Sequence, residues 1–291
     1  MKKDLISTQD LSTKDVDLLF RQTKSLKKKN CAGKVVVLAF FEPSTRTRLS
    51  FEIAAKSFGA HVVCIESEGS SLKKGESLAE TLRTINAMQP DALVIRHQTS
   101  GAAFMASKIM DCPVINAGDG THEHPTQSLT DVFTIQQKKK VRGLNVAIVG
   151  DIRHSRVARS NIYLLQKMGA KIHLVGPSSL VPNEWKSKNT TLHHEWGRLL
   201  VEADVIMMLR IQQERMSENF FSSTAEFAAR FGLNRERLKQ IRPDAMILHP
   251  GPVNVGVECT AEVLQDARCC VEKQVSNGVL IRTAILQGLL S

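Results

Sequence analysis

An apolar strand runs directly into the start of a helix in the segment Val35-Val36-Val37-Leu38-Ala39-Phe40-Phe41-Glu42-Pro43-Ser44-Thr45-Arg46-Thr47-Arg48. Residues 35–41 form the short apolar run that is typical of a buried strand, and apolar residues then recur with helical spacing from Phe51 to Phe58. Pro43 and Ser44 favour a helix start, with Ser44 in the N-cap position. The segment therefore predicts one strand–helix unit of an α/β fold.

The same alternation of short apolar runs and amphipathic helical patterns continues along the chain. Such alternation implies parallel sheets, and we expect two domains, each a mainly parallel sheet flanked by helices. The expected strands are Val35–Phe41, His61–Ile65, Ala92–Ile95, Val146–Val149, Lys171–Val175, Val205–Leu209 and Ala245–Leu248.

The length of 291 residues suits two domains, each with its own core. The pattern breaks at Lys138–Gly143, which predicts a first domain over residues 1–137 and a second over residues 138–291. Residues 278–290 form an apolar helical pattern after the turn signal Asn277-Gly278. We expect this C-terminal helix to pack back on the first domain.

Composition places the chain among ordinary globular proteins of the cytoplasm. Hydrophobic residues make up 42% and charged residues 23% of the sequence. We expect no membrane span, because no apolar run reaches about 20 residues, and no signal peptide, because no apolar segment follows Met1-Lys2-Lys3-Asp4. The six cysteines form no CxxC pair, which favours reduced thiols over a disulfide framework.

The formal net charge of +10 leaves two classes of partner open: nucleic acids and small anions. The densest basic clusters, Lys24–Lys29 and Lys138–Lys140, are short, and the chain has a single Tyr. Lysines of this kind are usually a solvated helix face or loop. We therefore expect pockets for small anions, and no nucleic-acid partner.

The helix start at Ser44–Thr47 has the properties of an anion site. The first N–H groups of a helix lack intrahelical partners and lie at the positive end of its dipole. The hydroxyl groups of Ser44, Thr45 and Thr47 add donors, and Arg46 adds a guanidinium group suited to phosphate. The alternative is an ordinary polar cap followed by exposed arginines, since caps of this kind are common.

A Ser/Lys/Gly segment, Ser70-Ser71-Leu72-Lys73-Lys74-Gly75-Glu76-Ser77, predicts a flexible loop before the next helix. Ser77 and Glu80 have the spacing of a capping box, which predicts that this helix begins after Ser77. A lysine such as Lys74 can move in to neutralise a bound anion. The alternative is a solvated loop lysine.

Two further motifs of the first half place polar groups near helix and strand ends. Arg96 ends a strand, and ligands of open α/β sheets collect at the carboxyl ends of strands. His124 and Gln127 flank a predicted helix start at Pro125 and can face one site. A metal site formed by His122, Glu123 and His124 is the weaker interpretation, because the spacing lacks the HExxH pattern.

The second half places arginines and a rigid turn after three predicted strands. The turn after Val149 keeps Gly150 of the dinucleotide fingerprint but has Ile152 and Ser155 at the other two glycine positions, so NAD binding is not expected. That turn carries Arg153, Arg156 and Arg159, and Arg210-Ile211-Gln212 follows the strand Val205–Leu209. His249-Pro250-Gly251-Pro252 follows another strand, and a cis peptide before Pro252 fits such a turn. The alternatives are surface salt bridges and a plain turn.

Five motifs together resemble those of the aspartate carbamoyltransferases in order and spacing, over nearly the whole chain. They are Ser44-Thr45-Arg46-Thr47-Arg48, Lys74-Gly75-Glu76, His124-Pro125-Thr126-Gln127, Arg210-Ile211-Gln212 and His249-Pro250-Gly251-Pro252. The first is shared with the ornithine carbamoyltransferases, which are expected to carry a His-Cys-Leu-Pro turn and a Ser-Met-Gly loop instead of the later ones. One departure is Asn254-Val255-Gly256, where many relatives have Asn-Arg-Gly.

The resemblance implies transfer of the carbamoyl group of carbamoyl phosphate to L-aspartate in pyrimidine biosynthesis, with no cofactor and no metal. It implies a carbamoyl-phosphate domain, an aspartate domain and a homotrimer with shared active sites, which Ser70 (or Ser71) and Lys74 would enter from a neighbouring subunit. A regulatory chain or dihydroorotase as partner stays open. The residues implied for catalysis are Arg46, Thr47, Arg96, His124 and Gln127, and those for substrate binding are Ser44, Thr45, Ser70, Lys74, Arg156, Arg210, Gln212, Pro250, Gly251 and Pro252.

Three other functions compete with this interpretation. A carbamoyltransferase for ornithine would need a carboxylate for the cationic side chain, where this chain has Arg210 and Gln212. A basic nucleic-acid-binding protein would bind arbitrary DNA in a salt-dependent way. A non-enzymatic relative would bind ligand as part of a larger assembly.

Overall fold

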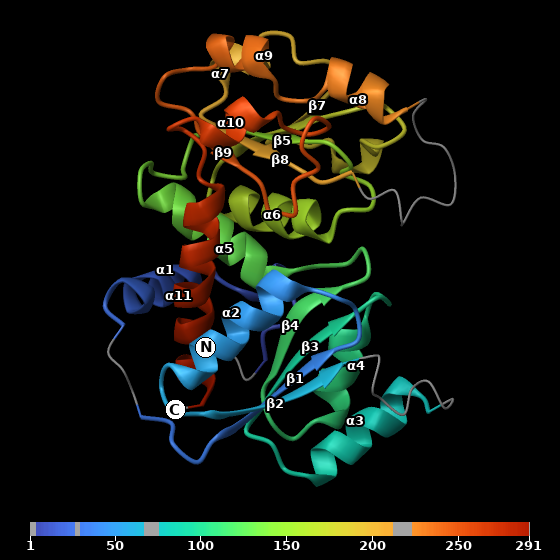
Figure 1. The fold of residues 1–291 in the computed structure, drawn as a ribbon, viewed down its shortest axis with the longest axis vertical. Helices are drawn as coiled ribbons and strands as arrows, with labels where there is room; N and C mark the ends of the chain where they lie inside the picture. The colour runs from blue at the N-terminus through green and yellow to red at the C-terminus, as the bar shows by residue number, and fades with distance from the viewer. Residues whose placement is uncertain (1–3, 27–29, 67–75, 212–222, 291) are drawn as a thin grey trace. The chain divides into compact units, whose positions relative to one another are not determined.

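The computed structural model describes residues 4–26, 30–66, 76–211 and 223–290 (Figure 1). The chain forms two compact units. Unit 1 consists of Met1–Thr130 with Val275–Ser291, and unit 2 consists of Asp131–Gln274. Each unit contains one parallel sheet with helices packed on it, so the expected architecture of two mainly parallel sheets is confirmed.

The sheet of unit 1 has the strand order β2-β1-β3-β4, and all of its strand pairs are parallel. α3 and α4 cover one face, where their side chains form a core with alternate residues of β1 and β3. α2 packs against β1 and β2. The strands are β1 (Val35–Phe40), β2 (His61–Glu66), β3 (Ala92–His97) and β4 (Val114–Asp119), and the helices are η1 (Thr8–Asp10), α1 (Thr13–Lys24), α2 (Thr45–Lys56), α3 (Leu78–Ala87), α4 (Ala102–Ile109) and the first part of α5 (Pro125–Gln136).

The sheet of unit 2 has the strand order β7-β6-β5-β8-β9 and is also parallel throughout. Alternate residues of β5 and β8 form a core with Phe227, Phe231 and Leu238 from α8 and α9. The strands are β5 (Asn145–Val149), β6 (Lys171–Val175), β7 (Thr190–His193), β8 (Val205–Met208) and β9 (Met246–Leu248), and the helices are α6 (Arg156–Lys167), η4 (Asn183–Trp185), α7 (Leu199–Glu202), α8 (Thr224–Arg230), α9 (Arg235–Gln240) and α10 (Ala261–Gln265).

The seven predicted strands are all present with small changes at their ends, but two strands were not predicted. β4 begins apolar and ends in Asn116-Ala117-Gly118-Asp119, which does not continue the apolar run. It is nevertheless buried, because Leu5 lies beside it and exchanges backbone hydrogen bonds with Val114 and Asn116. β7 is a short edge strand in which only Thr190 is buried.

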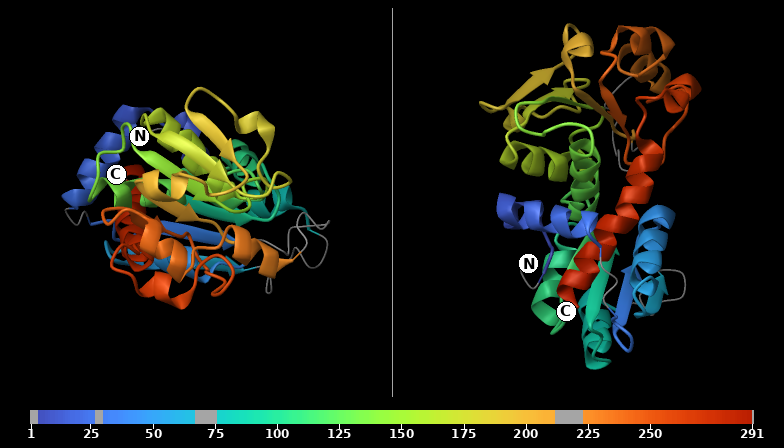
Figure 2. Two further views of the ribbon diagram at one scale, coloured as in Figure 1. Left: turned by 90° about the horizontal axis from the view of Figure 1, so that it is seen from above. Right: turned by 90° about the vertical axis from the view of Figure 1, so that its left-hand side faces the viewer.

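The C-terminal helix α11 (Val271–Leu289) starts earlier than predicted. The Asn277-Gly278 pair, read from the sequence as a turn, lies inside the helix. The expected packing of this helix on the first domain is confirmed, because Val275–Ser291 belongs to unit 1 and Arg282 of α11 lies over the ring of Phe51 of α2. The right-hand view of Figure 2 shows the two helices side by side.

Helix termini of unit 1 follow the sequence signals closely. Ser77 accepts a hydrogen bond from the Glu80 backbone while the Glu80 side chain accepts one from Ser77, so the predicted capping box is present. α5 starts at Pro125, as expected. Within the described residues, no helix is both long enough and apolar enough to span a membrane.

Candidate functional site

The candidate residues of unit 1 surround a reversal in strand order. From β1 the chain proceeds to β2 on one side, whereas β3 and β4 lie on the other side of β1. Phe40 at the end of β1 is paired with Arg96 of β3, and the backbone N–H of Phe41 donates to the carbonyl of Arg96 at 2.9 Å. Ligands of open α/β sheets bind outside the carboxyl ends of strands at such a reversal.

The start of α2 lies immediately beyond this point. Ser44 occupies the N-cap position as predicted, but its side chain makes no capping hydrogen bond. The N–H groups of the first helical turn are therefore not capped by Ser44, and they lack intrahelical acceptors by position. Thr47 is buried within this turn, whereas Thr45 and Arg46 are exposed. This arrangement can bind an anion through backbone N–H groups with an exposed guanidinium group beside them.

The side chain of Arg96 lies between the loop after β1 and strand β4. Its Nη1 donates to the carbonyl of Ala117 at 3.2 Å, and its Nη2 lies 3.4 Å from Oε1 of Glu42. Only 12% of the side chain is exposed. Glu42 immediately precedes Pro43 and Ser44, so Arg96 is held beside the start of α2 with its charge partly balanced.

His124 and Gln127 lie at the start of α5. His124 is buried, and its carbonyl accepts a hydrogen bond from the N–H of Gln127 at 3.0 Å. The loop that leads to His124 leaves β4 at Asp119, whose backbone N–H donates to the carbonyl of Glu123 at 3.2 Å. The two predicted residues therefore lie in one helical turn. The loop before that turn is hydrogen-bonded to the carboxyl end of β4.

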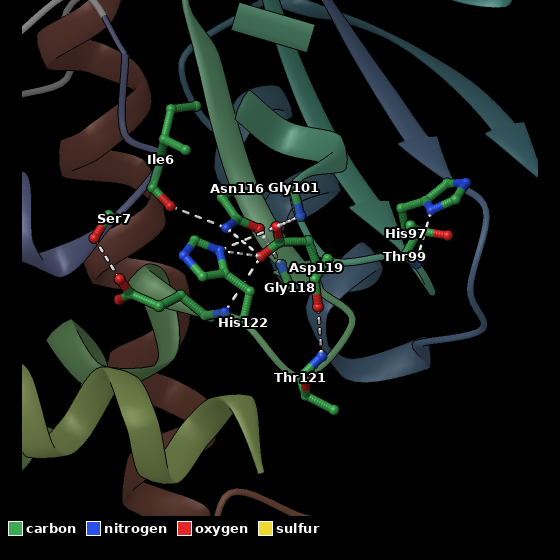
Figure 3. A network of polar contacts seen from close by, with 12 residues as sticks. Ile6, Ser7, His97, Thr99, Gly101, Asn116, Gly118, Asp119, Thr121 and His122 are labelled. Atoms are coloured by element: carbon green, nitrogen blue, oxygen red, sulfur yellow. Dashed lines mark hydrogen bonds and ion pairs between the residues drawn. The ribbon is translucent and has the colours of Figure 1, made fainter. Parts of the chain in front are cut away.

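A network centred on Asp119 fixes this loop (Figure 3). Its carboxylate accepts hydrogen bonds from the Gly101 backbone at 2.8 Å, from Nδ2 of Asn116 at 2.8 Å and from Nδ1 of His122 at 3.1 Å. Burial alone would raise the pKa of Asp119, but the hydrogen bonds from His122, Asn116 and Gly101 outweigh it and hold the pKa below its usual value. Asp119 therefore acts as an ionised anchor for the segment before His124.

The three side chains weighed as metal ligands have other roles. Glu123 is fully buried and accepts hydrogen bonds from the backbone and hydroxyl of Thr8, at 3.0 and 2.6 Å, and from the hydroxyl of Ser7. It thus anchors η1 beside the residue that precedes α5. His122 is bound to Asp119. In the part of the chain that the structure describes, no group of three or more His, Cys, Asp or Glu side chains is arranged to hold a metal ion.

The sheet of unit 2 has a second reversal in strand order, between β5 and β8. Gly150 follows β5, and a Cβ at this position would lie 3.1 Å from Cβ and 3.2 Å from the carbonyl oxygen of Leu209, so the glycine permits the close approach of the two strand ends. Arg156 follows β5 and Arg210 follows β8. The two arginines expected to bind aspartate therefore flank this reversal, at the carboxyl edge of the sheet.

Of the three arginines in the turn after β5, Arg156 is the buried one. It is the first residue of α6, where the side chain of Ser155 accepts a hydrogen bond from the N–H of Ala158. Nε of Arg153 donates to the carbonyl of Ser179 at 2.8 Å, and Arg159 lies over the ring of Trp185. Arg153 and Arg159 therefore have structural partners within the turn and the helix surface.

The turn His249–Pro252 follows β9, next to the loop that carries Arg210. The N–H of His249 donates to Oε1 of Gln274, and the N–H of Gly251 donates to Nδ1 of His249, both at 2.9 Å. Gly251 has a φ of 68°, and the peptide bond between Gly251 and Pro252 is cis, as considered from the sequence. Pro250 and Gly251 are half-buried, so their carbonyl groups lie near the surface of the unit. The hydrogen bonds of His249 and Gly251 hold the turn that carries them.

Three of the predicted site residues, Ser70, Lys74 and Gln212, lie outside the described residues. Two residues that were not selected from the sequence, Glu42 and Glu258, contact the candidate groups. Glu42 is bound to Arg96, and Glu258 accepts a hydrogen bond from the N–H of Ile211 at 2.8 Å. Neither could be selected by a motif. A single glutamate in a loop has no characteristic spacing to other residues, so a buried glutamate cannot be distinguished from a solvent-exposed one.

Two family models match the chain. The carbamoyl-phosphate-binding domain of aspartate/ornithine carbamoyltransferases matches residues 3–137, and the Asp/Orn-binding domain of the same family matches residues 142–289. The catalytic subunit of aspartate carbamoyltransferase from Pelagibacter ubique is 45% identical over 98% of this chain and 95% of its own length.

Solved structures with the same fold include both branches of this family. Aspartate transcarbamoylase from Trypanosoma cruzi in complex with carbamoyl aspartate and phosphate has a TM-score of 0.90 and 30% identity, covering 99% of this chain and 96% of its own. Ornithine carbamoyltransferase from Pyrococcus furiosus has a TM-score of 0.86 and 27% identity, covering 98% and 96%. The full-length matches and both domain models establish that this chain belongs to the aspartate/ornithine carbamoyltransferase family.

Proposed function

We propose that this chain is an aspartate carbamoyltransferase: it transfers the carbamoyl group of carbamoyl phosphate to the amine of L-aspartate, giving N-carbamoyl-L-aspartate and phosphate. The observation that carries the proposal is the placement of Arg156 and Arg210 on the two sides of the β5/β8 reversal. Two guanidinium groups there suit a substrate with two carboxylates. The relative from Pelagibacter ubique is named for the same activity.

The phosphate group binds at the start of α2. The N–H groups of the first turn, the hydroxyls of Ser44, Thr45 and Thr47, and the guanidinium group of Arg46 supply the donors. Arg96 approaches from the end of β3 and exchanges its contact with Glu42 for the substrate. Lys74 of a neighbouring subunit adds a third cationic group.

The carbonyl oxygen of carbamoyl phosphate is polarised by Thr47, Arg96 and His124. The attacking amine converts this carbonyl into a tetrahedral oxyanion, and donors fixed before the reaction stabilise the charge that develops there. The buried position of His124 and the Asp119 network supply that rigidity. Gln127 and the backbone carbonyls of Pro250 and Gly251 accept hydrogen bonds from the carbamoyl NH2 group, and Pro252 shapes the turn.

Arg156 and Arg210 bind the two carboxylates of aspartate, with Gln212 supporting Arg210. The amine nitrogen then bonds to the carbonyl carbon, the bond from that carbon to the phosphate oxygen breaks, and the leaving phosphate takes the proton of the amine. The protein contributes orientation and charge stabilisation, and no covalent intermediate is required.

We further propose a cytoplasmic homotrimer whose active sites are completed by Ser70 (or Ser71) and Lys74 of a neighbouring subunit, acting in pyrimidine biosynthesis. Exposed apolar side chains on α2 and on the edge strand β2, among them Leu49, Ile53 and Val63, offer a surface for self-association. A regulatory chain or a dihydroorotase is a further candidate partner. Sedimentation of the purified chain, alone and with each candidate, measures the assembly.

The test of the proposed function is carbamoyl transfer by the purified chain, supplied with carbamoyl phosphate and either L-aspartate or L-ornithine, with products identified by mass. Carbamoyl-aspartate alone supports the proposal. Citrulline would retain the phosphate site but contradict the role of Arg156 and Arg210. Absence of both products in folded protein would contradict the proposal and favour a non-enzymatic role.

A further inference from the structure

Glu258 is a buried carboxylate in the loop that follows the His249–Pro252 turn, and its side chain has no exposed surface. Oε1 accepts hydrogen bonds from the backbone N–H of Ile211 and from Nδ2 of Asn254, both at 2.8 Å, and Oε2 accepts one from the backbone N–H of Asn254 at 2.7 Å. Three donors therefore converge on one carboxylate from two loops that are distant in sequence.

The first of these donors belongs to the peptide group that joins Arg210 to Ile211. On the other side of Arg210, the N–H of Leu209 donates to the carbonyl of Val149 at 2.8 Å, immediately after the last residue pair of β5 and β8. The backbone of Arg210 thus lies between one anchor in the sheet and one anchor on Glu258.

The other two donors belong to Asn254, two residues after Pro252. The turn is held at its start by Gln274 and at its end by Glu258, because the N–H of His249 donates to Gln274 and that of Asn254 donates to Glu258. Nδ1 of His249 accepts from Gly251, which places the imidazole proton on Nε2, at 3.9 Å from Oε2 of Glu258. Glu258 therefore fixes the spacing between the Arg210 loop and the turn.

Burial of a carboxylate is unfavourable unless hydrogen bonds compensate for the lost hydration. Burial raises the pKa of the Glu258 carboxyl, while the donors from Ile211 and Asn254 act against that rise. Hydrogen bonds to a charged acceptor are stronger and more directional than those to a neutral one. A neutral side chain of the same shape would hold the two loops less firmly.

We propose that Glu258 is a positioning residue for aspartate: it fixes the peptide after Arg210 against the His249–Pro252 turn, so that the guanidinium group of Arg210 meets a substrate carboxylate. This inference rests on the proposed function and names a residue that acts through Arg210 without touching substrate. A merely structural glutamate would support the fold of unit 2 and would leave the requirement for aspartate unchanged in folded protein.

The central experiment compares Glu258→Gln with the wild-type chain in the carbamoyl-aspartate assay. With glutamine at this position, the side-chain NH2 group faces at least one of the three converging N–H donors and cannot accept a hydrogen bond from it. We expect the KM for aspartate to rise about tenfold, which is the effect of losing one charge-assisted hydrogen bond in the bound state. The dissociation constant of inorganic phosphate should stay within about twofold, because phosphate is assigned to the start of α2 in unit 1, whereas the His249–Pro252 turn is assigned to the carbamoyl NH2 group.

Glu262→Gln is the matched control, because Glu262 is exposed on α10 and the substitution removes the same charge from the same part of the sequence. We expect wild-type kinetics from it. If Glu258→Gln does not fold, Asn254→Ala decides the question. It removes one donor and leaves the carboxylate, and we expect a smaller rise in the KM for aspartate in the same direction.

A double-variant cycle with Arg210→Ala separates positioning from general damage. If Glu258 acts through Arg210, adding Glu258→Gln to Arg210→Ala leaves the KM for aspartate nearly unchanged, since the interaction to be positioned is already absent. Additive effects would overturn the inference, as would wild-type aspartate kinetics in folded Glu258→Gln or Asn254→Ala. A wild-type chain that forms no carbamoyl-aspartate would instead overturn the proposed function, and this inference with it.

Discussion

The guanidinium group of Arg282 lies over the ring of Phe51, with Cζ 5.2 Å from the ring centroid, and so joins the C-terminal helix to the helix whose start is the candidate phosphate site. Nη2 of the same arginine lies 3.5 Å from the hydroxyl of Thr126, in the first turn of α5. Gly278, one turn earlier in α11, leaves the space that this buried side chain occupies.

Gly278→Ala is expected to lower the melting temperature. Alanine normally stabilises a helix by about 1 kcal/mol relative to glycine, but a Cβ here would lie 2.5 Å from Nη1 of Arg282. Displacing the buried guanidinium group from Phe51 should cost about 1–3 kcal/mol, as overpacking does elsewhere. Gly288→Ala in the same helix is the control, because nothing lies within 4 Å of its Cβ. Equal Tm changes in both variants would contradict this account.

His124→Ala is expected to reduce turnover by about 10²–10³-fold, which is the effect of losing one preorganised oxyanion donor. In the proposed function His124 acts on the reacting carbonyl, so the loss should appear in kcat of chains that are shown to be folded. The measurement is steady-state kinetics with aspartate in excess. His61→Ala, on the exposed start of β2, should keep wild-type turnover. Turnover near wild type in His124→Ala would show that the assigned role is wrong.

Arg210→Ala should raise the KM for aspartate far more than the KM for carbamoyl phosphate. A guanidinium–carboxylate pair contributes about 1.5–3 kcal/mol, which corresponds to a rise of about ten- to a hundredfold. Arg230→Ala provides the comparison, because Arg230 forms an exposed pair with Glu226 on α8 at 3.2 Å. Equal effects of Arg210→Ala on both substrates would count against the assignment of this arginine to aspartate.

Mixing Arg46→Ala chains with Lys74→Ala chains should restore activity that neither has alone. If each site takes Arg46 from one subunit and Lys74 from the next, random exchange gives about a quarter of native sites in a cyclic trimer. The measurement is activity after dissociation and reassembly, with subunit exchange verified by mass. Mixing wild-type with wild-type chains controls for losses on reassembly. Absence of rescue after verified exchange would favour sites within single chains.

Stability should fall as the pH drops below about 6.5, through a histidine pair in unit 2. Nδ1 of His173 and Nε2 of His193 lie 3.0 Å apart. The pKa of His173 is lowered by burial and by the charge of His193, and the pKa of His193 by burial and by the charge of His194. Because the folded pKa values lie below the ordinary value, the unfolded chain takes up more protons as the pH falls, and folding becomes less favourable.

The check is the melting temperature at pH 7.5 and pH 5.5, in wild type and in His173→Asn/His193→Gln. We expect a smaller loss of Tm in the double variant, since the paired groups no longer resist protonation. His61→Gln, which changes an exposed histidine, should behave as wild type. A double variant with the full wild-type loss would assign the acid sensitivity to other groups, such as His97.

Much of the fold was predictable, because parallel strands buried on both faces leave continuous apolar runs. β4 and β7 were missed for opposite reasons. The apolar run of β4 is broken by Asn116 and Asp119, and the distant Leu5 pairs with this strand, whereas β7 is a short edge strand. The Asn277-Gly278 pair was misread as a turn because its glycine serves a side-chain contact within a helix, and a local signal carries no information on such a contact.

Most residues of the candidate site could be predicted from the sequence for a related reason. Arg96, Arg210 and His249 each follow an apolar run, and the carboxyl ends of parallel strands lie on one edge of a sheet. Glu258 could not be predicted from the sequence, because its role depends on two loops that only the folded chain places side by side. Strand order, which assigns these loops to the two reversals, is a property of the folded chain that no local pattern encodes.

The reversals in strand order also bear on how this family diversified its chemistry. The groups assigned to phosphate lie at the β1/β3 reversal, and those assigned to the amino acid lie at the β5/β8 reversal. The polar side chains of each set lie outside the two apolar cores, although Phe41 and Ile211 of the same loops belong to those cores. A different acceptor amine therefore calls for changes in the Arg210 loop, at the β5/β8 reversal. The groups assigned to the phosphate of the donor lie at the other reversal, outside the loop that such changes would alter.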